Sequence, residues 1–122
     1  MKGGVYKQKN IYIIDDDESI CEGLKILLIT YGFEVKTFNS AKSFFDATSN
    51  NTTGCVVLDI NMPEVNGWAV LKRIVKSGWI LPVILISAAH ENTIDHALQA
   101  GAAGFLQKPF DGQKLVDLLM AA

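Results

Sequence analysis

Four acidic residues, at positions 15 to 18, directly follow the apolar run from Ile11 to Ile14. Adjacent carboxylates repel one another, and a pair about 4 Å apart near a protein surface costs roughly 4 kcal/mol before relaxation. Water, a helix N-terminus or a bound cation would offset that repulsion. The first question is therefore whether the fold places water, a helix N-terminus or a bound cation next to these carboxylates.

Other residues suited to phosphoryl chemistry lie at the ends of later apolar runs. Asp59 ends "CVVLD", Ser87 follows "VILI", and Lys108 follows closely on Phe105 and Leu106. Carboxylates bind hard cations such as Mg²⁺, whereas a lysine and a hydroxyl donate to phosphoryl oxygens. These run ends offer no His, Cys or activated Ser, so the available nucleophile is a carboxylate. Asp59 is the best placed, because a buried strand would fix its position.

The apolar runs predict the strands that would position these residues. The runs span Ile11 to Ile14, Phe33 to Phe38, Cys55 to Leu58, Val83 to Ile86, and Phe105 to Leu106. Runs such as "CVVL" and "VILI" are continuous rather than alternating, which is typical of strands buried on both faces of a parallel sheet. Each is separated from the next by a segment with helical features.

The segments between the runs carry signals for the ends of helices. The first helix is predicted to stop at Gly32, and Ser40, Asn66 and Asp111 are predicted to cap later helices. Asp17 and Glu18 suit the first turn of the first helix. The segment from Asn92 to Ala100 is also predicted to be helical, with an apolar stripe formed by Ile94, Ala97 and Leu98.

This alternation predicts an α/β fold: a single open, doubly wound, five-stranded parallel sheet. It would be flavodoxin-like, with strand order 2-1-3-4-5 and five helices on its two faces. Ligands bind such sheets beyond the carboxyl ends of the strands. Five polar residues are therefore expected to converge at that edge, namely Asp15, Asp16, Asp59, Ser87 and Lys108.

Composition restricts the class of protein. The chain has 122 residues, 49% of them hydrophobic and 20% charged, which fits one globular domain. A net charge of -2 gives no basic stripe for nucleic acid, and no apolar stretch reaches the length of a membrane span. Cys21 and Cys55 are far apart in the sequence and predict two buried thiols of a reduced, cytoplasmic protein.

The motifs, taken in order, resemble the receiver domain of two-component response regulators. They are the acidic pair after the first strand, "D-x-x-M-P-x-x-x-G" from Asp59 to Gly67, Ser87 after "VILI", and "K-P-F" from Lys108 to Phe110. The resemblance runs from about Asn10 to the last residue. Residues 1–9 are accordingly interpreted as an N-terminal extension and residues 10–122 as the receiver domain.

The resemblance implies a role for each site residue. Asp59 would accept a phosphoryl group from a sensor histidine kinase or a phosphotransfer protein. Mg²⁺ would be held by Asp15, Asp16, the Asp59 carboxylate and the backbone carbonyl of Asn61, with Asp16 as a direct ligand and Asp15 acting through water. Lys108 would pair with a phosphoryl oxygen.

The resemblance also implies a switch. Ser87 would swing to hydrogen-bond the phosphoryl group, Phe105 would turn inward, and the bond between Lys108 and Pro109 would be cis. The face made by the fourth helix, fifth strand and fifth helix would then meet an output domain, a separate protein or a second copy of the chain. Such a protein catalyses only its own phosphorylation and dephosphorylation and acts on no metabolite.

Two features depart from the common pattern of the receiver family. The segment from Ser87 to Lys108 is one residue shorter than in most members, which affects the start of the fourth helix and the switch surface there. The positions two residues after Asp59 and Ser87 hold Asn61 and Ala89. In this family these positions tune the lifetime of the phosphoryl group. The output that the switch would control is left open by the sequence.

Two other functions remain to be weighed against the switch. A phosphatase of the haloacid-dehalogenase type also uses aspartate and Mg²⁺, with Asp15 as the nucleophile. That type usually has a cap domain, for which this chain has no room, and Glu18 stands where Thr or Val is expected. A flavodoxin-like FMN binder would need a Ser/Thr/Gly-rich phosphate loop where this chain has acids.

Aromatic and histidine residues outside these motifs have less specific interpretations. Trp68 is predicted to pack and Trp79 to face a partner. His90 and His96 are interpreted as surface residues, because neither lies near other metal ligands in the sequence pattern.

Overall fold

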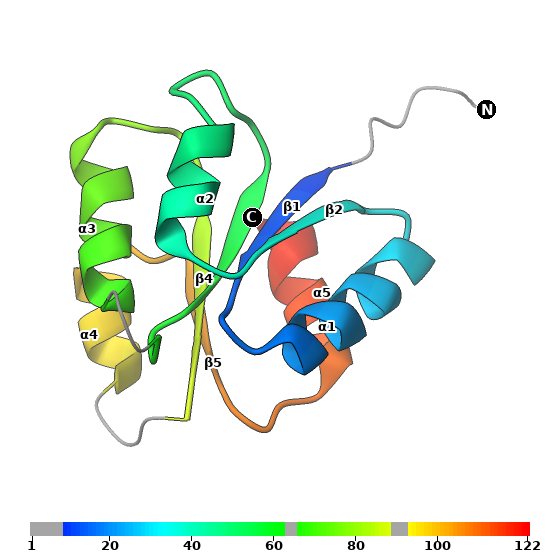
Figure 1. Cartoon of the computed structure of the whole chain (residues 1–122). Helices are drawn as coiled ribbons and strands as arrows, with labels where there is room; N and C mark the ends of the chain where they lie inside the picture. The colour runs from blue at the N-terminus through cyan, green and yellow to red at the C-terminus, as the bar shows by residue number, and fades with distance from the viewer. Residues whose placement is uncertain (1–8, 63–65, 89–92) are drawn as a thin grey trace.

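A five-stranded parallel sheet forms the centre of the protein (Figure 1). The computed structural model describes residues 9–62, 66–88 and 93–122. The strands are β1 (Asn10–Ile14), β2 (Glu34–Phe38), β3 (Cys55–Asp59), β4 (Val83–Ser87) and β5 (Gly104–Gln107). The helices are α1 (Glu18–Thr30), α2 (Ala41–Ala47), α3 (Gly67–Lys76), α4 (Thr93–Gln99) and α5 (Gly112–Ala121). The strand order β2-β1-β3-β4-β5 confirms the predicted fold class.

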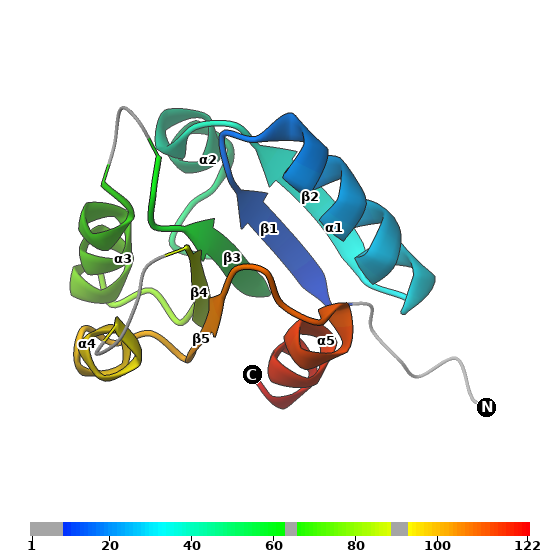
Figure 2. The same cartoon turned by 90° about the horizontal axis from the view of Figure 1, so that it is seen from below.

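The helices form one layer on each face of the sheet. Viewed from below, α1 and α5 lie on one side and α2, α3 and α4 on the other (Figure 2). The core between the sheet and α1 and α5 is mainly aliphatic and includes Cys21 and Cys55. The core on the opposite face includes the buried aromatic ring of Phe44. Both cysteines are free and buried, as the sequence predicted.

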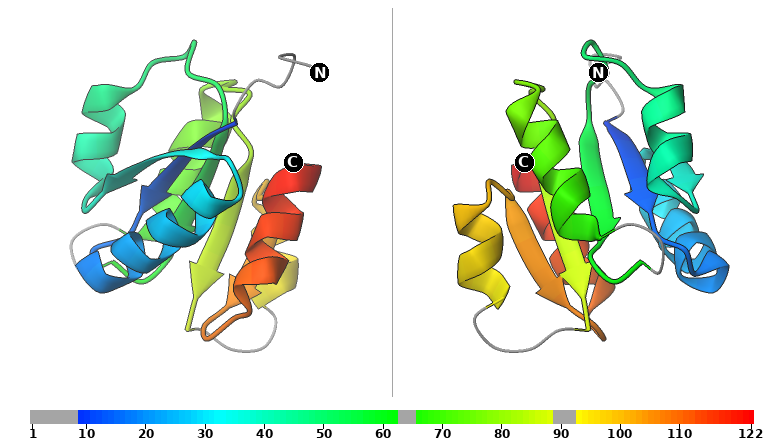
Figure 3. Two further views of the ribbon diagram at one scale, coloured as in Figure 1. Left: turned by 90° about the vertical axis from the view of Figure 1, so that its right-hand side faces the viewer. Right: turned by 60° about the vertical axis from the view of Figure 1, so that its left-hand side comes forward.

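The central strands are the most buried elements and carry the polar residues to one edge of the sheet. Every residue of β3 and β4 is buried, whereas the edge strand β2 is largely exposed. The strand arrows all point toward the same end of the molecule (Figure 3). We call this end the carboxyl edge. In the register, Asp59 pairs with Ile86 and Ser87 pairs with Gln107, so both polar residues reach that edge.

Capping side chains start the helices at the predicted positions. Ser40, Asn66 and Asp111 are the N-caps of α2, α3 and α5. Asp17 is the N-cap of α1, where its Oδ1 accepts a hydrogen bond from the backbone N–H of Ser19 at 2.9 Å. Two residues of the acidic run, Asp17 and Glu18, therefore belong to the start of a helix rather than to the site.

Two of the packing predictions are wrong. Ala97 is completely buried, but Ile94 and Leu98, which were predicted to share its apolar stripe, are 56% and 52% exposed. The reason is that α4 packs onto the sheet through a small residue and turns its larger apolar side chains outward. Trp79 packs rather than faces a partner: its ring stacks on Phe45 at 6.3 Å, and its Nε1 atom is buried.

The other aromatic predictions agree with the structure. Trp68 packs against the core, and its ring stacks on that of the exposed His96, with 4.2 Å between the ring centroids. His90 and Ala89 lie outside the described residues, as does the connection before Thr93.

Lys9 is bound to the folded domain although the sequence placed it in an extension. Its carbonyl oxygen accepts a hydrogen bond from Glu34 N at 3.1 Å, and its Nζ donates to Leu119 O at 2.7 Å. The boundary after residue 9 stays a prediction. None of the helices described here is both long and apolar enough to cross a membrane.

Candidate phosphoryl-binding site

The carboxyl edge brings two buried carboxylates together. Asp15 directly follows β1, Asp59 ends β3, and the two residues are 0% and 3% exposed. Backbone hydrogen bonds continue the sheet past both positions. Asp15 N donates to Phe38 O, and Ile60 N donates to Ile86 O, each at 3.0 Å. The sheet itself therefore fixes where the carboxylates lie.

Lys108 reaches both carboxylates from the end of β5. Its Nζ lies 3.3 Å from Asp15 Oδ2 and 3.7 Å from Asp59 Oδ2. Its backbone N donates to Ser87 O at 2.7 Å, which joins the ends of β4 and β5. The Lys108–Pro109 peptide bond is cis, as the resemblance implied. Two buried carboxylates therefore share one ammonium group.

Burial raises the pKa of the Asp15 carboxyl above its ordinary value. The backbone N–H of Asp17, which donates to Asp15 Oδ1 at 2.9 Å, acts in the opposite direction. The Asp59 carboxylate raises the pKa further, and Lys108 lowers it. The net upward shift means that the surroundings do not fully compensate a negative charge on Asp15. A cation at this edge would supply that compensation.

The acidic residues at the carboxyl edge fit a divalent cation. Asp15, Asp16 and Asp59 each offer one carboxylate oxygen, and these oxygens all lie within 4.8 Å of one another. Asp16 is exposed, so one side of the cluster is open to water. An oxygen-only ligand set with access to water is what Mg²⁺ requires.

Ser87 and Asn61 meet beside these carboxylates. Ser87 is fully buried, and its Oγ donates to the side-chain Oδ1 of Asn61 at 2.7 Å. The backbone N–H of Asn61 in turn donates to Asp59 Oδ1 at 3.0 Å. Phe105 is half-buried and packs against the core on the α3 and α4 side of the sheet.

The structure thus brings Asp15, Asp16, Asp59, Ser87 and Lys108 to one edge. The sequence named Asn61 for its backbone carbonyl and for its position two residues after Asp59, but the hydrogen bond from Ser87 to its side chain was not expected. No sequence pattern could have given this contact, because it depends on how the ends of β3 and β4 align in the sheet.

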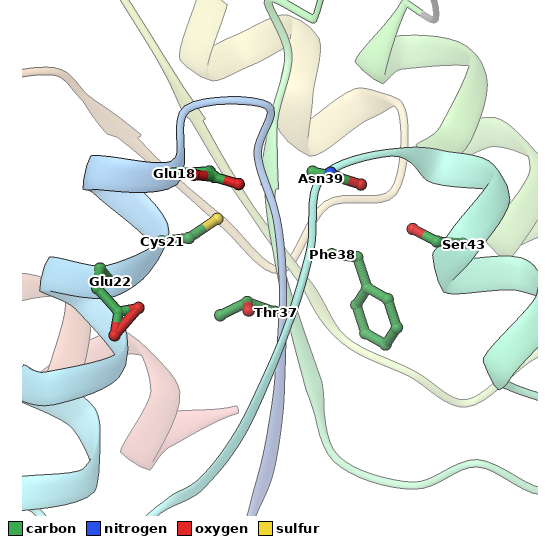
Figure 4. Close-up of a pocket in the computed structure, with 7 residues that line it drawn as sticks. All are labelled: Glu18, Cys21, Glu22, Thr37, Phe38, Asn39 and Ser43. Carbon is green, nitrogen blue, oxygen red and sulfur yellow. The ribbon is translucent and has the colours of Figure 1, made fainter.

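A groove runs beside the site between α1 and the start of α2 (Figure 4). It is lined by Glu18, Cys21, Glu22, Thr37, Phe38, Asn39 and Ser43. Burial and the neighbouring acids raise the pKa of the Cys21 thiol to about 11. Its Sγ donates to the carbonyl oxygen of Asp15 at 3.3 Å. This upward shift of the pKa favours the protonated thiol over the nucleophilic thiolate at neutral pH.

Comparison with known families agrees with this arrangement. The family model described as "Response regulator receiver domain" matches residues 11–120. The chain therefore belongs to the response regulator receiver domain family, whose members are phosphoryl-accepting switches. The alternative of a haloacid-dehalogenase-type phosphatase with Asp15 as nucleophile has no support from these matches.

Individual relatives are similar along most of this chain. The transcriptional regulatory protein TdiR of Thauera aromatica is 39% identical over 113 residues, which is 92% of this chain and 50% of the relative. The chain thus spans about half the length of the curated relatives it matches. The structure of the response regulator StyR superposes with a TM-score of 0.85 at 34% identity, covering 94% of this chain and 59% of that one. FixJ-N also gives a TM-score of 0.85, at 27% identity, covering 94% and 93% of the two chains.

Proposed function

We propose that Asp59 is the phosphoacceptor of this receiver domain. The observation that carries the proposal is its position: a buried carboxylate at the end of a central strand, with Lys108 Nζ 3.7 Å away and two further acids beside it. In the reaction, an Asp59 oxygen bonds to phosphorus as the bond from phosphorus to the donor histidine nitrogen breaks. The electron pair of that bond returns to the imidazole.

Asp15, Asp16, Asp59 and the backbone carbonyl of Asn61 would hold Mg²⁺, with Asp16 as a direct ligand and Asp15 acting through water. The bound ion would offset the repulsion between the Asp59 carboxylate and an incoming phosphoryl group. The exposed side of Asp16 and the raised pKa of the buried Asp15 support this assignment.

Lys108 and Ser87 would donate to the oxygens of the phosphoryl group. Lys108 already lies between the carboxylates, so its ammonium group needs little movement to pair with a phosphoryl oxygen. Ser87 would have to turn away from Asn61 to do the same. Phe105 would respond by turning inward, which would change the face formed by α4, β5 and α5.

The proposed partners follow from the family. A sensor histidine kinase or phosphotransfer protein would supply the phosphoryl group, and the face formed by α4, β5 and α5 would contact an output domain, a separate protein or a second copy. The chain would act on no metabolite and would catalyse only its own phosphorylation and dephosphorylation. The free thiols of Cys21 and Cys55 support a cytoplasmic location.

Incubation with Mg²⁺ and acetyl phosphate, followed by intact mass, tests the phosphoacceptor. We expect the wild-type chain to gain one phosphoryl group, Asp59→Asn to gain none, and Asp15→Asn to gain it at a reduced rate. Incorporation that survives in Asp59→Asn and disappears in Asp15→Asn would make Asp15 the nucleophile and overturn the proposal.

Titration with Mg²⁺, followed by tryptophan fluorescence or calorimetry, tests the metal ligands. We expect Asp16→Ala to weaken Mg²⁺ binding at least about tenfold, because a direct carboxylate ligand is lost. The matched control is Asp117→Ala, since Asp117 is an exposed acid on α5, away from the site. Equal Mg²⁺ affinity of the wild type and Asp16→Ala would exclude Asp16 as a ligand.

A further inference from the structure

The hydroxyl of Ser87 donates a hydrogen bond to the side chain of Asn61. The two atoms are 2.7 Å apart, with Ser87 Oγ as donor and Asn61 Oδ1 as acceptor. Ser87 is fully buried at the end of β4, whereas Asn61 is exposed and comes two residues after Asp59. The contact therefore links the strand end that carries the switch serine to the strand end that carries the acceptor.

The backbone around Asn61 is fixed by two further contacts. Its N–H donates to Asp59 Oδ1 at 3.0 Å. It also forms a β-bridge with Asn66, the residue that caps α3. The backbone that carries the Asn61 side chain is therefore anchored to the proposed acceptor and to the start of α3, within reach of Ser87.

A serine hydroxyl has a single proton to donate. In this structure the proton is directed to Asn61 Oδ1, whereas in the proposed function it must point to an oxygen of the phosphoryl group on Asp59. The amide and the phosphoryl group therefore compete for one donor. We propose that Asn61 is a positioning residue whose side chain holds Ser87 in the resting orientation and thereby opposes activation without a phosphoryl group. This inference rests on the proposed function of Ser87.

The chemistry of the two acceptors gives the direction of the competition. A hydrogen bond to an ionised phosphoryl oxygen is about twice as strong as one between neutral groups. The phosphoryl group therefore takes Ser87 from Asn61 when it is present, and Asn61 retains Ser87 when it is absent. Removing the amide should make the active orientation easier to reach and should raise the affinity for a phosphoryl analogue.

NMR of the unphosphorylated, metal-free protein tests the resting contact directly. We expect the Asn61 side-chain amide signals to shift in Ser87→Ala, because the bonded hydroxyl is lost. The side-chain amide of Asn39, an exposed residue on the groove beside the site (Figure 4), should not shift. Unchanged Asn61 signals in Ser87→Ala would show that the hydrogen bond is absent in solution and would overturn the inference.

Titration with beryllofluoride in the presence of Mg²⁺ tests the competition. We expect Asn61→Ala to bind this analogue about 2- to 10-fold more tightly than the wild type, which corresponds to one neutral hydrogen bond. The matched control Asn39→Ala should bind it with wild-type affinity. In a Ser87→Ala background, the further change Asn61→Ala should have no effect, since no hydroxyl remains to be released.

The double variant separates a positioning role from a general effect on the site. An equal gain from Asn61→Ala with and without the Ser87 hydroxyl would mean that the amide acts on the metal or on the charge of Asp59, and would overturn the inference. The inference would also be overturned if Asn61→Ala bound beryllofluoride with the same affinity as the wild type. A failure of the proposed function differs from both, because the wild type would then take up no phosphoryl group on Asp59.

Discussion

Helices α3 and α4 lie beside each other on the same face of the sheet but are held in different ways (Figure 2). The first buries Gly67, Val70, Leu71 and Ile74, whereas Ala97 is the buried residue of α4 among those described. The large apolar side chains of α4, Ile94 and Leu98, are about half exposed. Helix α3 therefore packs into the core through several residues, whereas α4 packs onto it mainly through Ala97.

This difference corresponds to the proposed tasks of the two helices. The loop that follows Asp59 leads into α3, so a firmly packed α3 would keep the proposed acceptor and its ligands in place. In the proposed function the switch acts at Ser87, after which the chain leads to α4, and a lightly packed helix would shift at low cost. Packing would then be firm at the part proposed to perform the chemistry and lighter at the part proposed to respond.

Truncating one leucine on each helix should give the largest contrast. We expect Leu71→Ala, at a fully buried position of α3, to lower the free energy of unfolding by about 2–5 kcal/mol. Leu98→Ala, at a position 52% exposed on α4, should change it by less than about 0.5 kcal/mol. Urea denaturation followed by circular dichroism measures both. Similar losses in the two variants would show that α4 is as firmly packed as α3.

The first residue of α3 should tolerate no side chain. A Cβ on Gly67 would lie 2.5 Å from the Cα of Ile60 and 2.8 Å from the carbonyl oxygen of Asp59. Because both are backbone atoms, we expect Gly67→Ala to cost about 1–3 kcal/mol of stability and to slow phosphoryl uptake. Urea denaturation and intact mass would measure the two effects.

Gly23→Ala is the control for the Gly67 variant. Gly23 lies inside α1 with no atom within 4 Å of a built Cβ, so the change should stabilise the protein by about 0.5–1 kcal/mol. If both alanine variants were stabilised, the close approach of α3 to the strand that carries Asp59 would not exist in solution.

The stack between Trp68 and His96 joins the two helices, and its loss should have a smaller effect. The rings are 4.2 Å apart and inclined by 15°. We expect His96→Ala to cost about 0.5–1.5 kcal/mol and to change the emission of Trp68, recorded in a Trp79→Phe background. Phosphorylation should change the same emission if α4 moves. Identical emission from His96→Ala and its parent would mean that the rings do not stack.

The sequence was sufficient to predict most of this fold. Continuous apolar runs located β3 and β4, because a strand buried on both faces must be largely apolar. The capping residues Ser40, Asn66 and Asp111 located the helix starts for a local reason, since a side-chain oxygen must satisfy free N–H groups. The prediction for the apolar residues of α4 was wrong because helical spacing shows which residues share a face of the helix. It does not show whether other parts of the protein cover that face.

The site was predictable to the extent that it depends on strand ends. Asp15, Asp59 and Lys108 could be placed at one edge because parallel strands end together. The hydrogen bond from Ser87 to Asn61 could not, since it depends on the relative register of β3 and β4 and on a side-chain rotamer. Neither the strand register nor the rotamer can be derived from the spacing of residues in the sequence.

The exposed apolar residues of α4 should matter for partners and hardly at all for folding. Ile94 is 56% exposed on α4, and Ile80, on the connection between α3 and β4, is 90% exposed. We expect Ile94→Lys and Ile80→Lys each to change the free energy of unfolding by less than about 0.5 kcal/mol.

If α4 belongs to the responsive face, only Ile94→Lys should weaken self-association of the protein activated with beryllofluoride and Mg²⁺, measured by sedimentation equilibrium. Equal behaviour of the two activated variants would place any self-association elsewhere, because both changes add the same charge to a similarly apolar, exposed position. A loss of stability in Ile94→Lys alone would instead mean that α4 is anchored through this face, and the contrast with α3 would then disappear.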